Sequence, residues 1–595
     1  MRRNNSLWKT TAVSISAMMT VSMGAAVWAA STEKTTQESQ SDQAIENETE
    51  KITEDSETKE DSNNTENQTA EPQSTNTEDA SDSSENQTEE CKIELSDDSI
   101  LVDGEAISTD SESAVYAGAD IVYYKEGQDS TYGAGGEDDG HSEEEAAEHT
   151  VVTITKAGTY RVSGTLSKGQ IAIDLGEDSR DDESAVVNLI LDNADITCTV
   201  ASGIVVYNAY ECGSDDTEAA TKDVDTTNAG VHIILADDSE NTVNGSHVAK
   251  IYKEGTTQED VDAGNAKKQW KFDAAIDSLV SIEFDAEEET GTLAVNSDNE
   301  GIETSRHLTI NGGTITINSN DDAINANEDG VSVITINGGV LTCNAGGGKE
   351  GDGIDSNGWI VINDGVVVSA ANATSQDSGV DSDNGIYING GTVLASGNMY
   401  DEVSEDSEQA FVALSFADSV EAGQMFALKN ADGEIVTVFS AANDFQTLVY
   451  SSSELTDGDY TLYEISSAEG VAVSGLYTEV TSVSDEVQLQ GSKGAGGFGR
   501  MGGGMGKPNG ERPEMPDGEA PSKSDGEAPS GQEGEAPSKP EGEAPSGQNG
   551  ERPERPEDSS EEASSVFTIS GISNNFSHIS ELTTEAYEEE SSTNV

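Results

Sequence analysis

An Asn-Gly-Gly-like turn recurs through the middle of the chain and constrains the fold more than any other feature. The turn begins at Asn311, Asn337, Asn363 and Asn389, always 26 residues apart. Three apolar columns keep the same period: Leu308, Ile334, Ile360 and Ile386; Ile310, Ile336, Ile362 and Ile388; and Ile315, Leu341, Val367 and Val393. A fixed period of this length is typical of repeat proteins, in which each unit is stable only when stacked on its neighbours.

The segments around each turn alternate apolar and polar residues, as in L-T-I-N and T-I-T-I-N. This period of two and the β-branched residues predict short strands and no helices. We therefore predict an all-β fold, a parallel β-helix with coils of about 26 residues whose inner faces carry the apolar columns. Leucine-rich repeats have units of similar length, but they need an L-x-x-L-x-L-x-x-N frame. Isoleucine alternating with polar residues does not fit that frame.

The beginning of the chain predicts export. Basic residues Arg2, Arg3 and Lys9 precede an apolar run and the tripeptide Val27-Trp28-Ala29, so residues 1–30 are predicted to be a signal peptide. An uncleaved membrane anchor is the alternative. Residues 31–90 are nearly all small polar and acidic, and the net charge of the chain is -88. We predict a disordered acidic linker there and a secreted protein with no affinity for nucleic acid, and association with the cell surface stays open.

The remaining chain divides by composition. Residues 91–398 are predicted to form the β-helix, with regular coils from about residue 274, because Ile276, Ile282 and Phe284 precede the repeat by one period. Residues 399–490 read as a β-rich module or cap, with a hairpin turn at 430–433. Residues 491–560 are a Gly-rich and Pro-rich octapeptide spacer, and 561–595 a tail. Cys343 and Cys198 are placed in one inward column.

Acidic residues gather in the polar loops between the repeated strands. Four loops align at an apolar residue followed by an acid or amide, namely Ile302-Glu303, Ile324-Asn325, Ile354-Asp355 and Val380-Asp381. Stacking would place these side chains about 4.8 Å apart, in a ladder that repels itself unless neutralised. Ca²⁺ accepts six to eight oxygen ligands in forgiving geometry, and ordinary turn formation is the alternative explanation. The candidate calcium ligands are Asp298, Glu300, Glu303, Asp321, Asp322, Asp352, Asp355, Asp377 and Asp381.

The repeat G-D-G-I-D-S-N-G-W-I-V-I-N-D-G-V-V-V-S resembles the carbohydrate-binding β-helix family of clostridial surface proteins. The resemblance covers about 274–398 well and weakens back to Cys91. It implies a right-handed parallel β-helix similar to calcium-dependent pectate lyases, which binds cellulose and polygalacturonate. The calcium-site acids of the family map onto Asp352, Asp355, Asp377 and Asp381. Asn325 and Ala323 depart from the pattern, which puts a site in that coil in doubt.

Three functions remain open. The first, which we favour, is calcium-dependent and non-catalytic binding of a plant cell-wall polysaccharide by a monomer, with Trp359 and Tyr387 stacking on sugar rings. The second is a polysaccharide lyase acting on pectate, for which Lys349 in the loop A-G-G-G-K-E-G-D-G would be the base. The third is a structural adhesin or spacer of the cell wall, whose β-helix is only a rigid rod.

Overall fold

The computed structural model describes residues 90–288, 290–494 and 563–582. These residues form 38 strands and only short helices, α1 (Glu143–Ala147), α2 (Gln258–Asp262) and the 3₁₀ turn η1 (Glu177–Asp181). The all-β prediction is therefore confirmed for this part of the chain. Within it, no helix has the length and apolar character needed to span a membrane. The predicted signal peptide lies outside the described residues, and so do the acidic linker and the octapeptide spacer except for residues 90 and 491–494, of which 491–493 end strand β36.

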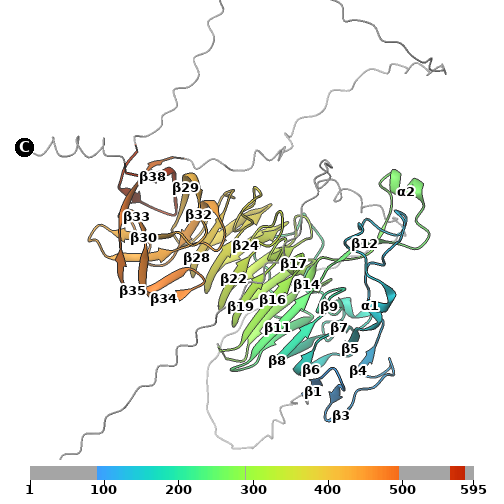
Figure 1. Cartoon of the computed structure of the whole chain (residues 1–595). Coiled ribbons are helices and arrows are strands. Elements are labelled where there is room, and N and C mark those ends of the chain that lie inside the picture. Colours follow the sequence, from blue (N-terminus) through green and yellow to red (C-terminus); the bar gives the residue numbers. More distant parts are fainter. Residues whose placement is uncertain (1–89, 289, 495–562, 583–595) are drawn as a thin grey trace, which may run out of the picture. The chain divides into compact units, whose positions relative to one another are not determined.

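Most strands before residue 398 belong to three stacks of parallel strands, which we name the first, second and third ladders (Figure 1). The first ladder stacks β10 (Val231–Leu235), β15 (Ile282–Ala286), β18 (His307–Ile310), β21 (Val333–Ile336), β24 (Trp359–Ile362) and β27 (Gly385–Ile388). The second stacks β11 (Glu240–Gly245), β16 (Thr292–Ser297), β19 (Thr314–Asn318), β22 (Val340–Asn344), β25 (Val366–Ala370) and β28 (Thr392–Gly397). The third stacks β5 (Thr150–Ile154), β7 (Gly169–Asp174), β9 (Ile204–Asn208), β14 (Ala274–Ser278), β17 (Glu300–Thr304), β20 (Ile324–Ala326), β23 (Ile354–Ser356) and β26 (Asp381–Ser382).

The predicted apolar columns are confirmed by the strand registers. Leu308 pairs with Ile334, and Ile315 pairs with Leu341, each 26 residues further along. All of the column residues are buried in one continuous core. In the turn between the first and second ladders, the asparagines form their own stack, in which Asn337 Nδ2 donates to Asn311 Oδ1 at 2.9 Å and the next two asparagines repeat the contact.

The last glycine of each turn explains why the turn sequence repeats. Gly313, Gly339, Gly365 and Gly391 have φ angles of 81°, 77°, 92° and 75°. This left-handed region is open to glycine and costs other residues energy. The side-chain amides of the asparagines thus hold neighbouring turns in register, while the glycines let the chain reverse into the second ladder.

The acidic segments differ from the prediction, because they are strands and not loops. Ile302, Ile324 and Ile354 pair in register along the third ladder and bury their side chains in the core. Two features of the sequence conceal these strands. They have only two to five residues, and the spacing between equivalent isoleucines is 22 and then 30 residues.

The earlier part of the molecule continues the same stacking with longer insertions. β8 (Val187–Thr197) pairs with β10 through its first half and with β11 through its second, so one long strand belongs to both ladders. β6 (Gly158–Leu166) and β1 (Cys91–Leu95) stack before β8. The placement of Cys198 was wrong by two residues: Cys198 is buried, but Ile196 pairs with Val243 in the column that leads to Cys343. Five further strands add antiparallel pairs: β2 (Leu101–Val102), β3 (Glu105–Ala106), β4 (Val115–Gly118), and β12 (Val248–Tyr252) with β13 (Lys268–Phe272).

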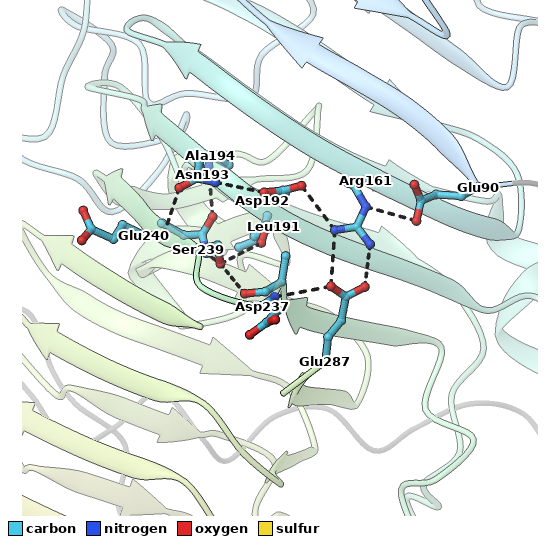
Figure 2. A network of polar contacts seen from close by, with 12 residues as sticks. Glu90, Arg161, Leu191, Asp192, Asn193, Ala194, Asp237, Ser239, Glu240 and Glu287 are labelled. Carbon is cyan, nitrogen blue, oxygen red and sulfur yellow. Dashed lines mark hydrogen bonds and ion pairs between the residues drawn. The ribbon is translucent and has the colours of Figure 1, made fainter. Parts of the chain in front are cut away.

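A polar network crosses the outer surface of these early strands (Figure 2). Arg161 on β6 lies 3.1 Å from Glu90, 3.3 Å from Asp192 and 2.5 Å from Glu287. The hydrogen bond with Glu287 is the largest cause that raises the pKa of Arg161 above its ordinary value, and burial opposes it. One guanidinium therefore joins three segments that are far apart in the sequence.

The C-terminal module is antiparallel and joins the last coil directly. Its strands are β29 (Phe411–Val420), β30 (Met425–Asn430), β31 (Ile435–Phe439), β32 (Phe445–Ser451), β33 (Gly458–Ile465), β34 (Ser467–Val473), β35 (Leu476–Ser484), β36 (Val487–Lys493), β37 (Phe567–Ile569) and β38 (Ser573–Glu581). β32 pairs antiparallel with β28, which covers the open edge of the second ladder. The hairpin predicted at 430–433 connects β30 and β31. β37 and β38, in the segment predicted as a tail, pair with β33, β29 and β36, and Phe567 and Phe576 pack in the module core.

Candidate functional site: an acidic column on the third ladder

One column of side chains on the third ladder is almost entirely acidic. Register pairs place Asp277 next to Glu303, Glu303 next to Asn325, Asn325 next to Asp355, and Asp355 next to Asp381. Because each of these residues follows a buried isoleucine or valine on its strand, the column lies on the face opposite the core. Neighbouring strands are about 4.8 Å apart, so carboxylates on adjacent strands repel one another, and Asn325 is the neutral member between the two halves of the column.

The first half of the column contains a buried carboxylate cluster, which we name the inner cluster. It consists of Asp273, Glu300 and Glu303, whose carboxylate oxygens lie within 4.8 Å of one another. All three residues are at most 8% exposed. The backbone N–H of Asp273 donates to Asp277 Oδ2 at 3.0 Å and to Glu303 Oε2 at 3.3 Å. The chain therefore folds back so that residues before β14 complete a cluster on β17.

The inner cluster has more negative charge than its neighbours can balance. Lys271 pairs with Asp273, and although burial opposes it, the charges of Asp273 and Glu303 raise the pKa of Lys271 above its ordinary value. Burial, followed by the charge of Glu303, raises the pKa values of Asp277 and Glu300 well above their ordinary range. One ammonium group thus faces four carboxyl groups.

Two oxygens at this place have no hydrogen-bond donor among the described residues. Asn325 Nδ2 donates to Glu300 Oε1 at 3.3 Å, which leaves Glu300 Oε2 and Asn325 Oδ1 buried and unpartnered. Leaving a buried polar atom without a partner costs roughly 1–3 kcal/mol, and more when it is charged. A bound cation would satisfy both oxygens. Asn325, whose coil the sequence left in doubt, therefore supplies a neutral oxygen next to the carboxylates.

The second half of the column forms an outer cluster of Asp352, Asp355 and Asp381. Their carboxylate oxygens also lie within 4.8 Å of one another, but the three residues are only half-buried. Asp322 lies beside them, because its Oδ1 accepts a hydrogen bond from the N–H of Asp352 at 2.6 Å. Asp352 Oδ1 in turn accepts from the N–H of Ser378 at 2.6 Å, which fixes the orientation of that carboxylate.

Protonation equilibria in the outer cluster show the same excess of negative charge. Burial and the charges of Asp355 and Asp352 raise the pKa of Asp322 well above its ordinary range. Burial and the charges of Asp381 and Asp355 do the same for Asp352. The pKa of Asp321 rises to about 6, through burial and the charge of Glu350. These carboxyl groups therefore keep their protons to a higher pH than exposed ones.

The remaining predicted ligands lie at the edge of the column or away from it. Asp377 Oδ2 accepts from the N–H of Gly351 at 2.6 Å and from Ser375, so it braces the loop that carries Asp352. Asp298 lies elsewhere, where it pairs with His247 Nδ1 at 3.1 Å and accepts from Ser246 Oγ at 2.6 Å. Both oxygens of Asp298 are therefore occupied, and the structure does not bring it to either cluster.

The side chain of Lys349 is exposed and makes no ion pair with the part of the chain that the structure describes. Its carbonyl oxygen accepts a hydrogen bond from Thr374 Oγ1 at 3.2 Å, which holds the backbone of the loop. No group among the described residues holds its ammonium toward the outer cluster, as a base acting beside a bound cation would require.

The two predicted sugar-binding aromatics lie on neighbouring strands of the first ladder. Trp359 begins β24 and Tyr387 lies on β27, both half-buried. Tyr387 continues the outward column of Thr309, Thr335 and Val361, as the sequence predicted. Lys222, which comes from the long segment between β9 and β10, places its ammonium 5.1 Å from the centre of the Tyr387 ring and also pairs with Asp223.

Sequence reasoning missed Lys271, Asp273 and Asp277. These residues lie one period before the strict repeat: Lys271 and Asp273 precede β14, and Asp277 lies on it. The signal that could have found them is the 26-residue offset between Ile276 and Ile302, which aligns Asp277 with Glu303.

Comparison with known proteins identifies the family. A family model described as "Carbohydrate-binding domain-containing protein" matches residues 148–470, which is more than half of the chain. The chain belongs to this family. The matched region of this carbohydrate-binding family member includes all three ladders, from β5 onward, and the C-terminal module as far as the first half of β34. A search of curated proteins finds no match.

Among solved structures, the chain is similar to one titled "Structure of the polysaccharide lyase-like protein from C. thermocellum, Gadolinium derivative". The two share 21% sequence identity, and the match covers 51% of this chain and 92% of that chain with a TM-score of 0.27. A TM-score this low supports no inference about the fold or the function of the present chain.

Proposed function

We propose that this protein is a secreted, calcium-dependent and non-catalytic binder of an acidic plant cell-wall polysaccharide, with polygalacturonate favoured over cellulose. Membership of the carbohydrate-binding family supports a glycan ligand. The observation that carries the calcium requirement is the acidic column, with its two carboxylate clusters and the unpartnered buried oxygens of Glu300 and Asn325.

The architecture that we propose is a right-handed parallel β-helix, closed by the antiparallel module after residue 398. Successive strands of the chain visit the first, second and third ladders in the same order, coil after coil. Such an order is expected when one coil contributes one strand to each face of a solenoid. In this architecture the acidic column lies on the outer face of the third ladder, and the aromatic residues lie on the first ladder.

The donor sets fit calcium. Ca²⁺ takes carboxylate, amide and water oxygens, and the clusters offer carboxylates with an amide oxygen from Asn325 between them. Asp273, Glu300 and Glu303 are buried, so an ion held there would bind the coils together. Asp352, Asp355 and Asp381 are half-buried, so an ion held there would keep coordination positions for a carboxylate of the polysaccharide.

Sugar rings would contact the outward aromatics of the first ladder. The faces of Trp359 and Tyr387 offer apolar area for stacking, and Lys222 beside Tyr387 offers a positive charge for a uronate. Because Asp223 already pairs with Lys222, a bound uronate carboxylate would replace Asp223 in that ion pair. The acidic balance of the chain makes such local positive charge necessary for an anionic ligand.

We propose binding without cleavage because Lys349, the only lysine of the outer-cluster loop, is exposed and no neighbour among the described residues directs it. A pectate lyase needs a base held at the proton beside the uronate carboxylate. The assay is the absorbance of the unsaturated product with pectate and calcium. A steady rise that the Lys349→Ala variant abolishes would replace the binding proposal with the lyase.

The remaining parts of the proposal concern the setting of the protein. We propose that residues 1–30 direct export, that the mature protein acts outside the cell, associated with the wall, and that it binds as a monomer. Immunodetection in the culture medium and the wall fraction tests the location. Light scattering of the purified protein tests the oligomeric state.

The experiment that tests the proposed function is a pull-down of the full mature chain with insoluble polygalacturonate. Calcium should retain the protein in the pellet, a chelator should release it, and added calcium should restore the binding. Cellulose and an uncharged mannan serve as comparison polymers. Equal binding with and without the chelator would contradict the calcium requirement, and binding to none of the polymers would favour a structural spacer.

A further inference from the structure

A second group of metal-binding side chains lies on the first ladder, away from the acidic column. Atoms of His232 on β10, Glu283 on β15 and Asp285 on β15 lie within 4.8 Å of one another. His232 pairs in register with Glu283, and Glu283 pairs with Thr309. In later coils the same outward positions carry uncharged residues, so the charge is confined to one place on this face.

The turn asparagine next to the group orients both carboxylates. Asn311 Nδ2 donates to Glu283 Oε1 and, at 3.0 Å, to Asp285 Oδ1. The other oxygen of each carboxylate points to the same imidazole nitrogen: His232 Nδ1 lies 3.4 Å from Glu283 Oε2 and 3.6 Å from Asp285 Oδ2. One nitrogen and two oxygens therefore converge, while Asn311 occupies the oxygens on the far side.

Glu283 is only 6% exposed, and its buried Oε2 accepts no hydrogen bond from the described residues. The three side chains lie at the wall of a hollow of about 420 Å³, which Thr226 and Thr309 also line. Thr226 Oγ1 donates to Thr309 Oγ1 at 2.7 Å and thereby ties the covering segment to the ladder. The converging atoms thus have room beside them for further ligands.

We propose that His232, Glu283 and Asp285 bind one divalent first-row transition-metal ion, of which Zn²⁺ is the test case. Ligands about 2.0–2.2 Å from a tetrahedral ion are about 3.3–3.6 Å from one another, which matches the two distances to His232 Nδ1. A neutral imidazole with two carboxylates balances the charge of a divalent ion. The imidazole favours zinc and its neighbours over calcium, which prefers oxygen donors.

The groups around the site support this role. Asn311 holds the carboxylates from behind, because its Nδ2 donates to one oxygen of each. Such outer contacts orient metal ligands and are worth about 10–100-fold in metal affinity. Three protein ligands leave at least one position open toward the hollow, for water or for an acidic group of a bound molecule.

The test uses the full mature chain, stripped with a chelator and then kept in excess calcium so that the carboxylate clusters of the third ladder are saturated. Zn²⁺ is titrated by calorimetry, and Co²⁺ absorption in the visible range reports on nitrogen ligation. We expect one equivalent of Zn²⁺ to bind. The variants His232→Gln and Asp285→Asn should weaken that binding at least 10-fold.

His247→Gln is the matched control. His247 also contacts two aspartates, but Asp298 lies on its Nδ1 at 3.1 Å and Asp139 on its Nε2 at 3.2 Å, so these carboxylates cannot converge on one ion with the ring. This variant should keep the full Zn²⁺ stoichiometry and the Co²⁺ spectrum. If His232→Gln does not fold, as judged by circular dichroism, Glu283→Gln takes its place.

Two results would overturn the proposal. If the wild-type chain bound no Zn²⁺ in excess calcium, the three residues would form only ion pairs between a protonated His232 and the carboxylates of Glu283 and Asp285. Unchanged Zn²⁺ binding by a folded His232→Gln or Glu283→Gln variant would place the ion elsewhere. The pull-down with polygalacturonate is independent of both results, because it depends on calcium at the third ladder and on Trp359, Tyr387 and Lys222, none of which is a ligand of this site.

Discussion

Replacing Asp355 by asparagine should change the stability of this protein in opposite directions with and without calcium. Asp355 is the central member of the outer cluster, and the equivalent residue of the previous coil is already an asparagine, Asn325. The substitution Asp355→Asn is therefore sterically compatible with the strand and changes only the charge and the donor properties of the side chain.

The size of the effect follows from the spacing of the carboxylates. Two unit charges about 4.8 Å apart repel by about 3.5 kcal/mol at an effective dielectric constant of about 20. Asp355 has two such neighbours, Asp352 and Asp381. The repulsion cannot exceed the cost of protonating one of the carboxyl groups, which is about 4 kcal/mol at pH 7 for a group with a pKa near 4. Since the three groups are half-exposed and screened, we expect the metal-free variant to gain about 1–2 kcal/mol.

With calcium the sign reverses, because the variant loses a charged ligand. A loss of 10–100-fold in calcium affinity corresponds to about 1.4–2.7 kcal/mol. The assay is thermal unfolding followed by circular dichroism, in a chelator and in saturating calcium. The midpoint of the variant should rise in the chelator, and the increase caused by calcium should shrink.

The control is Asp364→Asn in the turn of the same coil, where Asp364 is exposed and its carboxylate accepts a hydrogen bond from the N–H of Gly365 at 2.8 Å. This variant should respond to calcium like the wild type. If Asp355→Asn lowered the midpoint in the chelator, or left the calcium response unchanged, the outer cluster would be neither repulsive nor a calcium site.

Three further predictions concern pH, the sugar-binding face and the outer polar network. Carboxyl groups with raised pKa values bind more protons in the folded state than in the unfolded state, so the free energy of unfolding without calcium should fall as pH rises from about 4 through 6, the pKa of Asp321. Saturating calcium should remove most of this pH dependence. Urea unfolding at several pH values measures it. Tyr387→Ala should weaken polygalacturonate binding roughly 10-fold in calorimetry without changing the calcium response. Stacking on one ring contributes about 0.5–1.5 kcal/mol, and the contact of the Lys222 ammonium with the Tyr387 ring is lost as well. Binding equal to wild type would show that the sugar binds to another face. Arg161→Gln leaves three carboxylates without their shared guanidinium and should lower the free energy of unfolding by about 1.5–3 kcal/mol, whereas Lys168→Gln, in an exposed ion pair, should change it by less than about 1 kcal/mol.

The sequence predicted the apolar columns well because they obey two simple periods at once. Ile310 and Ile336 alternate with polar neighbours within each strand, and both return after 26 residues. The outward position of Tyr387 followed from the same alternation. The close stacking of parallel strands forces such regularity, since each inward side chain must pack on its equivalent in the next coil.

The strands of the third ladder were harder to predict because their length and spacing vary. A strand of two residues, such as β26, has no alternation to detect, and its aspartate looks like a turn residue. The inner cluster depends on Asp273, which reaches Glu300 and Glu303 only because β14 and β17 pair in register, 26 residues apart. The cluster therefore depends on contacts between residues that are far apart in the sequence. The same holds for β37 and β38, whose partner strands lie many residues earlier in the chain.

Binding of polygalacturonate fragments to the full mature chain, titrated by calorimetry at fixed pH in calcium and in chelator, tests the central proposal most directly. We predict saturable binding in calcium, none in the chelator, and binding weakened 10-fold or more by Asp355→Asn but not by Asp364→Asn. Equal affinity in calcium and in chelator would contradict a role for the acidic column in recognising the polysaccharide.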